Sequence, residues 1–117
     1  MELKGLRTVI YPANDLDAAR AWWSGVLGQD PYFVEPFYVG FEVAGYELGL
    51  VPDASFEEGA HVYWGVDDVQ AAVQEAVDAG AEVREQPTDV GGGIIVAMVA
   101  NPDGALVGFI YNPSFKG

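Results

Sequence analysis

The stretch Asp15-Leu16-Asp17-Ala18-Ala19-Arg20-Ala21-Trp22-Trp23-Ser24-Gly25-Val26-Leu27-Gly28 decides the fold, because it specifies one complete amphipathic helix. Asp15 is a residue type that caps helix N-termini, and Gly28 is the type that most often ends a helix. A helix here would carry its apolar side chains on one face: Leu16, Ala19, Trp23, Val26 and Leu27. Such a face must be buried against another element, so we expect this helix to lie on a sheet.

A second helix of the same kind follows in the other half of the chain. It is preceded by Asp67 and Asp68, either of which could cap it, and Gly80 supplies its stop. Its apolar positions have the spacing of one helix face: Val69, Ala72, Val73, Ala76 and Val77.

The two halves of the chain therefore repeat one arrangement. A β-prone run precedes each helix, at residues 6–11 and 61–66. Asp68 follows Asp15 by 53 positions, and the same offset aligns Thr8 with His61.

Strands joined by tight turns come after each helix. The patterns predict strands at residues 37–43, 46–52, 94–99 and 106–113, with turns at residues 44–45 and 101–104.

A strand-helix-strand-strand-strand unit used twice predicts an α+β fold of two βαβββ modules, each with a helix covering one face of a mainly antiparallel sheet. We place module one at residues 5–52, an acidic linker at 53–59 and module two at 60–113, within a single domain spanning residues 1–117. The modules would pair into a cup-shaped sheet with the helices on its outer face, and pockets between modules are favoured ligand sites.

Composition excludes several classes of partner. The net charge is −13 with only five lysines and arginines, so we expect no binding to nucleic acid. The chain has no apolar run of the roughly 20 residues that cross a bilayer, so we expect no membrane role. Its first residues lack a basic segment followed by an apolar run, which predicts no signal peptide and a cytoplasmic location.

Three segments of the chain resemble the vicinal oxygen chelate superfamily of glyoxalases, bleomycin-resistance proteins and extradiol dioxygenases. They are the helix at residues 15–28, similar to the family's D-L-x-x-(A/S)-x-x-F-Y-x-x-x-L-G, the run from His61 to Val69, and Asn101-Pro102-Asp103-Gly104-Ala105. In this order they cover essentially the whole chain. The resemblance implies that superfamily's fold and a glyoxalase-like member whose metal site is degenerate.

Metal-dependent members place four ligands on four strands, and the resemblance puts those positions at Thr8, Glu47, His61 and Gly108. Two of these residues can bind a metal, whereas Gly108 has no side chain where the family commonly offers Glu. A catalytic divalent metal usually needs three protein ligands. We therefore expect no metal and no other cofactor.

Strand alternation places His61 and Tyr63 together on the face that looks into the cup, and Glu47 and Tyr38 on the corresponding face of module one. His61 could bond a ligand or be satisfied by neighbouring backbone. Glu47 could bind a cationic group, act as a base or be hydrated at an open rim. Trp22 could wall a cavity or a subunit interface, or be partly buried beside the core.

The predicted ligand-binding residues are His61, Glu47, Tyr63, Thr8, Tyr38 and Trp22. No catalytic residue is assigned, because no serine stands at a recognisable motif spacing from the single histidine.

The sequence thus predicts a metal-independent protein that binds a small organic molecule in sequestration, resistance or sensing. Glu47 and the net charge of −13 favour a cationic or polar aromatic compound. The alternative is a glyoxalase- or isomerase-type lyase in which Glu47 moves a proton and His61, with or without a divalent metal, stabilises an enediolate-like intermediate. A third interpretation is a vestigial cup in an assembly partner. We expect a homodimer, as in proteins that this chain resembles.

Overall fold

The computed structural model describes residues 1–53, 57 and 59–114, which form eight strands and two helices. They divide into two compact units. The first unit comprises residues 8–61, and the second comprises residues 1–7 together with those from Val62 onward. Part of the predicted linker, residues 54–56 and 58, lies outside the described residues.

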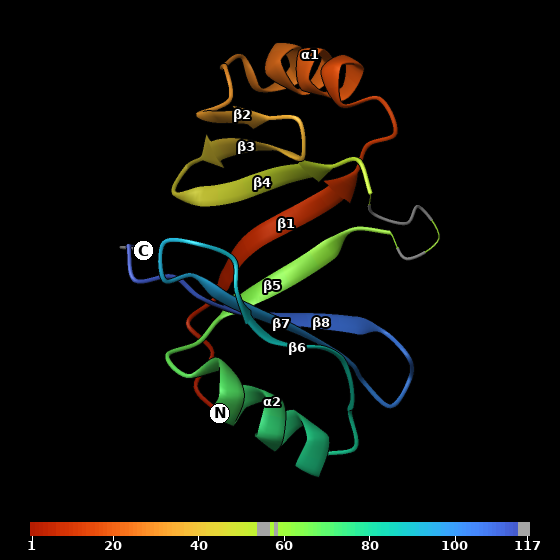
Figure 1. The fold of residues 1–117 in the computed structure, drawn as a ribbon, viewed down its shortest axis with the longest axis vertical. Helices are drawn as coiled ribbons and strands as arrows, with labels where there is room; N and C mark the ends of the chain where they lie inside the picture. Colours follow the sequence, from red (N-terminus) through yellow and green to blue (C-terminus); the bar gives the residue numbers. More distant parts are fainter. Residues whose placement is uncertain (54–56, 58, 115–117) are drawn as a thin grey trace. The chain divides into compact units, whose positions relative to one another are not determined.

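The first unit is a four-stranded mixed sheet with helix α1 (Leu16–Leu27) on one face (Figure 1). Its strand order is β2 (Phe33–Glu35), β3 (Tyr38–Val43), β4 (Tyr46–Val51) and β1 (Leu6–Pro12). Strands β2, β3 and β4 pair antiparallel, and β1 pairs parallel with β4.

The second unit repeats this architecture with helix α2 (Val69–Asp78) on its sheet (Figure 1). The order is β5 (His61–Gly65), β8 (Leu106–Tyr111), β7 (Ile95–Ala100) and β6 (Glu82–Asp89). Strand β5 pairs parallel with β8, and the other neighbours pair antiparallel. The predicted α+β class and the two βαβββ modules are confirmed.

The N-terminal segment, residues 1–7, belongs to the second unit, and Figure 1 shows it beside α2. The backbone N–H of Lys4 donates to the carbonyl of Gly65 at 2.8 Å, and the terminal ammonium pairs with Glu75 at 3.1 Å. The Lys4 ammonium lies 3.4 Å from the Asp67 carboxylate.

Both helices begin at the predicted kind of cap. The Asp15 carboxylate accepts from the N–H of Ala18 at 3.0 Å, and that of Asp68 accepts from the N–H of Ala71 at 3.0 Å. Asp68 rather than Asp67 is therefore the cap of α2. Gly28 ends α1 in the left-handed conformation, with φ of 68°.

Each helix buries a narrower stripe than the sequence predicts. In the first unit Val39, Phe41 and Leu50 form the core with four side chains of α1: Leu16, Ala19, Trp23 and Leu27. The prediction that Val26 shares this face is wrong, because it is 59% exposed. With 3.6 residues per turn Val26 lies about 80° around the helix from Leu16, at the edge of the stripe. In α2, Val77 lies about 80° from Val69 in the opposite direction around the helix, again at the edge of the stripe, and it is 37% exposed.

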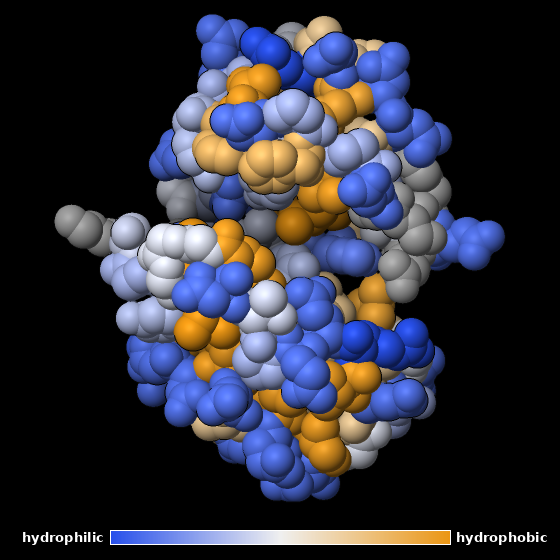
Figure 2. Space-filling model, viewed as in Figure 1, coloured by the Kyte–Doolittle hydropathy of each residue, from blue (hydrophilic) through white to orange (hydrophobic). Residues whose placement is uncertain are grey.

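Much of the surface is hydrophilic in both units, as Figure 2 shows for one face, in keeping with the net charge of −13. Helices α1 and α2 have 12 and 10 residues, so no helix among the described residues has the length to span a membrane.

Candidate functional site

In the first unit, the sheet face that points away from α1 carries three of the predicted site residues. Val39, Phe41 and Leu50 point toward the helix and are buried in the core. Because side chains alternate along a strand, the opposite face displays Thr8, Tyr38, Gly40, Glu47 and Gly49. We call these five residues, together with Glu42 on the same side of β3, the distal face of the first unit. Tyr38 and Glu47 therefore lie on the sheet face opposite α1, on one side of the sheet as strand alternation predicts.

Two glycines form the floor of the distal face. Gly40 and Gly49 are direct partners across β3 and β4, and both are buried. A Cβ atom on Gly40 would lie 2.8 Å from Oε2 of Glu47 and 3.0 Å from Cε1 of Tyr38. A Cβ atom on Gly49 would collide with the Tyr38 hydroxyl. The absence of these two side chains lets Tyr38 lie flat on the sheet.

Tyr32 completes this arrangement, and its hydroxyl donates a hydrogen bond to Oε2 of Glu47. The residue is 62% exposed as a whole. Burial of its hydroxyl, followed by the hydrogen bond and the charge of Glu47, raises the pKa of Tyr32 well above its ordinary value. The phenol therefore stays neutral and remains a donor. Sequence analysis missed Tyr32, because it precedes β2 outside any periodic pattern.

The distal face is electronegative. Glu42 and Glu47 are direct partners across β3 and β4. Oε1 of Glu42 accepts from the N–H of Gly45 at 3.1 Å. In the described part of the chain, neither carboxylate forms an ion pair with a lysine or arginine.

Thr8 and His61 occupy the ends of the first unit. Thr8 is buried and pairs with Glu47 across β1 and β4. His61 is half-buried at the start of β5. Thr8, Glu47 and Tyr38 are thus brought together on one sheet.

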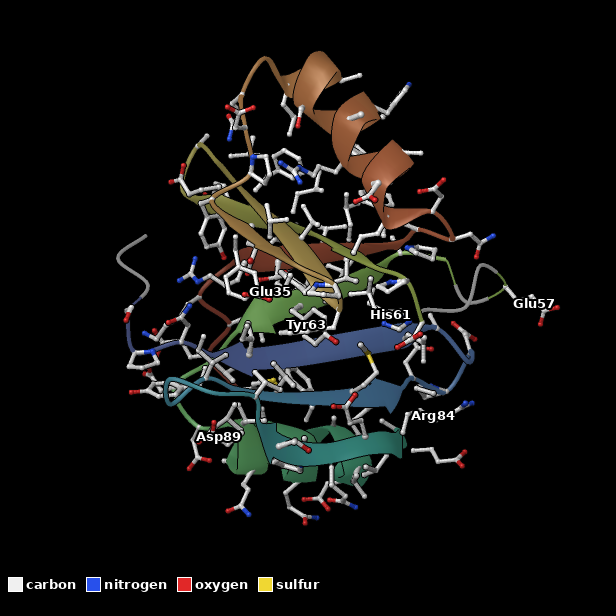
Figure 3. The ribbon with its side chains drawn as sticks, turned by 45° about the horizontal axis from the view of Figure 1, so that its top comes forward. Glu35, Glu57, His61, Tyr63, Arg84 and Asp89 are labelled. Atoms are coloured by element: carbon white, nitrogen blue, oxygen red, sulfur yellow. The ribbon has the colours of Figure 1, made fainter. Side chains whose placement is uncertain are left out.

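The second unit has its own tyrosine over a glycine. Gly108 pairs with Tyr63 across β8 and β5, and a Cβ atom on Gly108 would lie 2.6 Å from Cδ1 of Tyr63. Figure 3 shows Tyr63 against β8. Tyr63 is 6% exposed. Burial, with the charge of Glu85 as a smaller cause, raises the pKa of Tyr63 to about 12.

Trp22 lies apart from the other predicted site residues. It is on α1, on the opposite side of the sheet from the distal face, and it is 61% exposed. Its ring lies edge-on to the Trp23 ring, with the two ring centroids 5.0 Å apart.

A surface pocket of about 670 Å³ is also on the α1 side of the first unit. It lies between the start of α1 and the turn from β2 to β3. Its lining residues are Asn14, Asp15, Leu16, Asp17, Val34, Glu35, Pro36 and Val39. The six predicted ligand-binding residues are not among them.

The residues at the four implied metal-ligand positions do not fit a metal. Gly108 offers no donor, and the Tyr63 ring fills the space over it. The Glu47 carboxylate accepts from Tyr32. Across the described ranges, no group of three or more histidine, cysteine, aspartate or glutamate side chains is arranged to hold a metal ion.

The sequence of this chain matches a known protein family. The family model described as Glyoxalase/Bleomycin resistance protein/Dioxygenase superfamily matches residues 5–109. No curated protein sequence matched the chain.

Solved structures share the fold at low sequence identity. A hypothetical protein from Bacillus halodurans C-125 has a TM-score of 0.79 at 15% identity, covering 100% of this chain and 99% of that one. Streptomyces coelicolor methylmalonyl-CoA epimerase in complex with 2-nitronate-propionyl-CoA has a TM-score of 0.74 at 17% identity, covering 99% of each chain. A glyoxalase/bleomycin resistance protein/dioxygenase superfamily member from Vibrio splendidus 12B01 has a TM-score of 0.69 at 19% identity, covering 92% of this chain and 99% of that one.

Proposed function

The chain belongs to the glyoxalase/bleomycin resistance protein/dioxygenase superfamily, and from that premise we propose that it binds a small organic molecule without a metal ion. The guest is a cationic or polar aromatic compound, and the role is sequestration, resistance or sensing. The observation that carries the proposal is the Glu47 carboxylate, held by the Tyr32 hydroxyl beside the glycine floor and Tyr38. A carboxylate among aromatic rings offers charge and stacking surface to one guest.

Thermal-shift screening tests the proposal. We expect compounds of this class to raise the melting temperature of the wild-type protein, because a ligand that binds only the folded state stabilises it. Glu47→Ala should lose the shift. Glu82→Ala is a matched control, since Glu82 is an exposed glutamate on β6 in the second unit. A library of cationic and polar aromatic compounds that leaves the wild-type melting temperature unchanged would contradict the proposal.

Elemental analysis tests metal independence separately. The protein is purified without a metal-affinity tag after growth in medium supplemented with nickel, zinc, manganese and iron. We expect no stoichiometric metal. A stoichiometric metal that is lost in Glu47→Ala would overturn this part of the proposal and lead to glyoxalase and dioxygenase assays.

The second candidate function is an isomerase-type reaction in which Glu47 moves a proton. The hydrogen bond from Tyr32 favours it, because it fixes the orientation of the Glu47 carboxylate. The methylmalonyl-CoA epimerase fold match suggests the substrate to try first. Incubation with methylmalonyl-CoA in deuterated water should exchange the substrate's α-proton in the wild type but not in Glu47→Gln, and the absence of exchange in the wild type would remove this candidate.

We further propose that the chain acts as a homodimer. Light scattering at micromolar concentration should give about twice the monomer mass of 12.5 kDa. A mass near that of the monomer would contradict the dimer.

A further inference from the structure

Helix α1 has a second apolar stripe, on a side of the helix that its own sheet does not cover. Its buried stripe packs against β3 and β4. The second stripe has the i, i+3, i+4, i+7 and i+8 spacing of one helix face, and all five of its residues are exposed: Ala18, Ala21, Trp22, Gly25 and Val26. We call these five residues the outer stripe of α1. Trp22 and Val26 are each more than half exposed, and contiguous exposed apolar surface of this kind is typical of a contact with another molecule.

Charge narrows the choice of partner for the outer stripe. Asp17 and Arg20 are the charged residues of α1, and their charges cancel. A basic protein is attracted by clustered carboxylates and an anionic membrane by clustered lysines and arginines, and α1 has neither. Helix α2, in contrast, carries Glu75 and Asp78 with no cation. In a chain with a net charge of −13, a second copy therefore meets less repulsion at α1 than at α2.

The outer stripe is also complementary to itself in shape. Trp22 is its largest side chain, and Gly25, three residues further along the same side of the helix, has no neighbouring atom within 4 Å of its Cβ position. A two-fold axis perpendicular to α1, crossing between residues 23 and 24, would lay Trp22 of each copy over Gly25 of the other. A two-fold interface makes each such contact twice, and tryptophan is among the residues that contribute most to binding between proteins.

We infer that the outer stripe of α1 is a docking surface for a second copy of this chain, with the Trp22 ring of each copy packed over Gly25 of the other. The inference rests on the homodimer proposed above and names its contact surface. It assigns Trp22 to the contact between subunits and not to the ligand site.

Sedimentation equilibrium at several protein concentrations tests the inference by measuring the Kd of the dimer. Trp22→Ala should raise this Kd at least about tenfold, because the contact of Trp22 is lost on both copies. Phe37→Ala is the matched control, since Phe37 is an aromatic residue as exposed as Trp22 but lies in the turn between β2 and β3. It should leave the Kd unchanged.

Gly25→Leu separates a specific fit from unspecific apolar association. The new Cβ meets no atom within one copy, and leucine favours a helix more than glycine does, so this variant should fold even where Trp22→Ala does not. Its side chain would take the space that the Trp22 ring of the second copy occupies. We therefore expect Gly25→Leu to raise the Kd at least about tenfold, whereas unspecific association would become tighter with an added apolar group.

Sodium chloride provides a test on the unaltered chain. The contact itself is uncharged and each copy has a net charge of −13, so added salt should lower the Kd of the dimer by screening the repulsion between the copies. A dimer held by ion pairs would instead weaken as salt is added.

The results separate this inference from the proposed homodimer. If the wild type sediments as a monomer at every concentration, the homodimer and its contact surface are both wrong. If the wild type is a dimer whose Kd is unchanged in Trp22→Ala and Gly25→Leu, the homodimer stands and the outer stripe is not its surface. A tighter dimer in Gly25→Leu, or a Kd that rises with salt, would also contradict the inference.

Discussion

Gly108 and Gly25 differ in what an added methyl group would meet. In Gly108→Ala the new Cβ would lie 2.6 Å from Cδ1 of Tyr63 and 2.8 Å from the backbone carbonyl oxygen of Val62, which has no rotamer to move into. We expect the free energy of unfolding to fall by about 1–3 kcal/mol. Gly25 lies inside α1 with no atom within 4 Å of its Cβ position, so Gly25→Ala should raise that free energy by about 0.5–1 kcal/mol.

Urea denaturation of both variants checks these signs. A Gly108→Ala variant as stable as the wild type would show that Tyr63 does not lie over Gly108. In a Tyr63→Ala background, Gly108→Ala should cost less than it does in the wild type but still lower the free energy of unfolding, because the clash with the Val62 carbonyl remains.

The buried phenol of Tyr63 predicts a loss of stability at alkaline pH. Its pKa of about 12 exceeds the ordinary value of 10.0, so between these values the folded state holds a proton that the unfolded state has released. The contribution of Tyr63 to the free energy of unfolding is therefore intact below pH 10 and falls as pH rises toward 12, by about 1.4 kcal/mol per pH unit at most.

Ultraviolet titration measures the pKa of the tyrosines, and urea denaturation at several pH values measures how the free energy of unfolding depends on pH. Tyr63→Phe should remove the latest phenolate signal from this unit and make the alkaline loss of stability shallower. Glu85→Gln should lower the pKa of Tyr63 modestly, because the Glu85 charge is the smaller cause of the shift. An unchanged titration in Tyr63→Phe would contradict the assignment.

The orientation of a side chain within a strand could be predicted, but contacts between strands could not. Alternation placed Tyr38 and Glu47 on the distal face, because their chain neighbours Val39 and Leu48 are apolar and pack on the helix side. Tyr32 reaches Glu47 only because its backbone N–H bonds the Gly40 carbonyl at 3.0 Å and folds the segment onto the sheet. That contact belongs to the tertiary structure and leaves no local pattern in the sequence.

The helix caps allow a prediction for whole elements. Asp15→Ala and Asp68→Ala each remove an acceptor for a first-turn N–H, so each should lower the free energy of unfolding by about 1 kcal/mol. Asp17→Ala is the control, since Asp17 is in the first turn of α1 but is not its cap. Urea denaturation compares the three variants. Equal losses in Asp15→Ala and Asp17→Ala would show that charge near the helix start, and not the cap hydrogen bond, provides the stabilisation.

The strands that could be predicted from the sequence are those that bury one face and end at a recognisable turn. Strands β3 and β4 were predicted within one residue, because the Ala44-Gly45 turn between them adopts positive φ at both positions, 51° and 89°, which suits a tight hairpin. Strand β2 was not predicted by itself, since its three residues are all exposed and show no alternation. Strand β6 contains Pro87 and register shifts, which break its pattern in the same way.

The two units have the same order of helices and strands, but the pairing of their strands is shifted by two residues. Thr8 pairs with Glu47 in the first unit, whereas Gly108 pairs with Tyr63 in the second. The sequence alignment that equates Thr8 with His61 therefore differs from the strand pairing by two residues, which preserves the face but moves the position along the strand. An offset of this size cannot be seen in the sequence, because a shift of two keeps the same alternation.

The net charge of −13 acts on the molecule as a whole. Excess like charge destabilises a compact state through self-repulsion, and salt screens it over a Debye length of about 10 Å at 0.1 M. We expect the urea midpoint to rise as sodium chloride is added and then to level off. Glu82→Lys, an exposed change that makes the net charge less negative by two, should start from a higher midpoint and respond less to salt. A midpoint that is independent of salt in both proteins would contradict this prediction. It would show that repulsion between the carboxylates is negligible and that the net charge does not lower the stability of the fold.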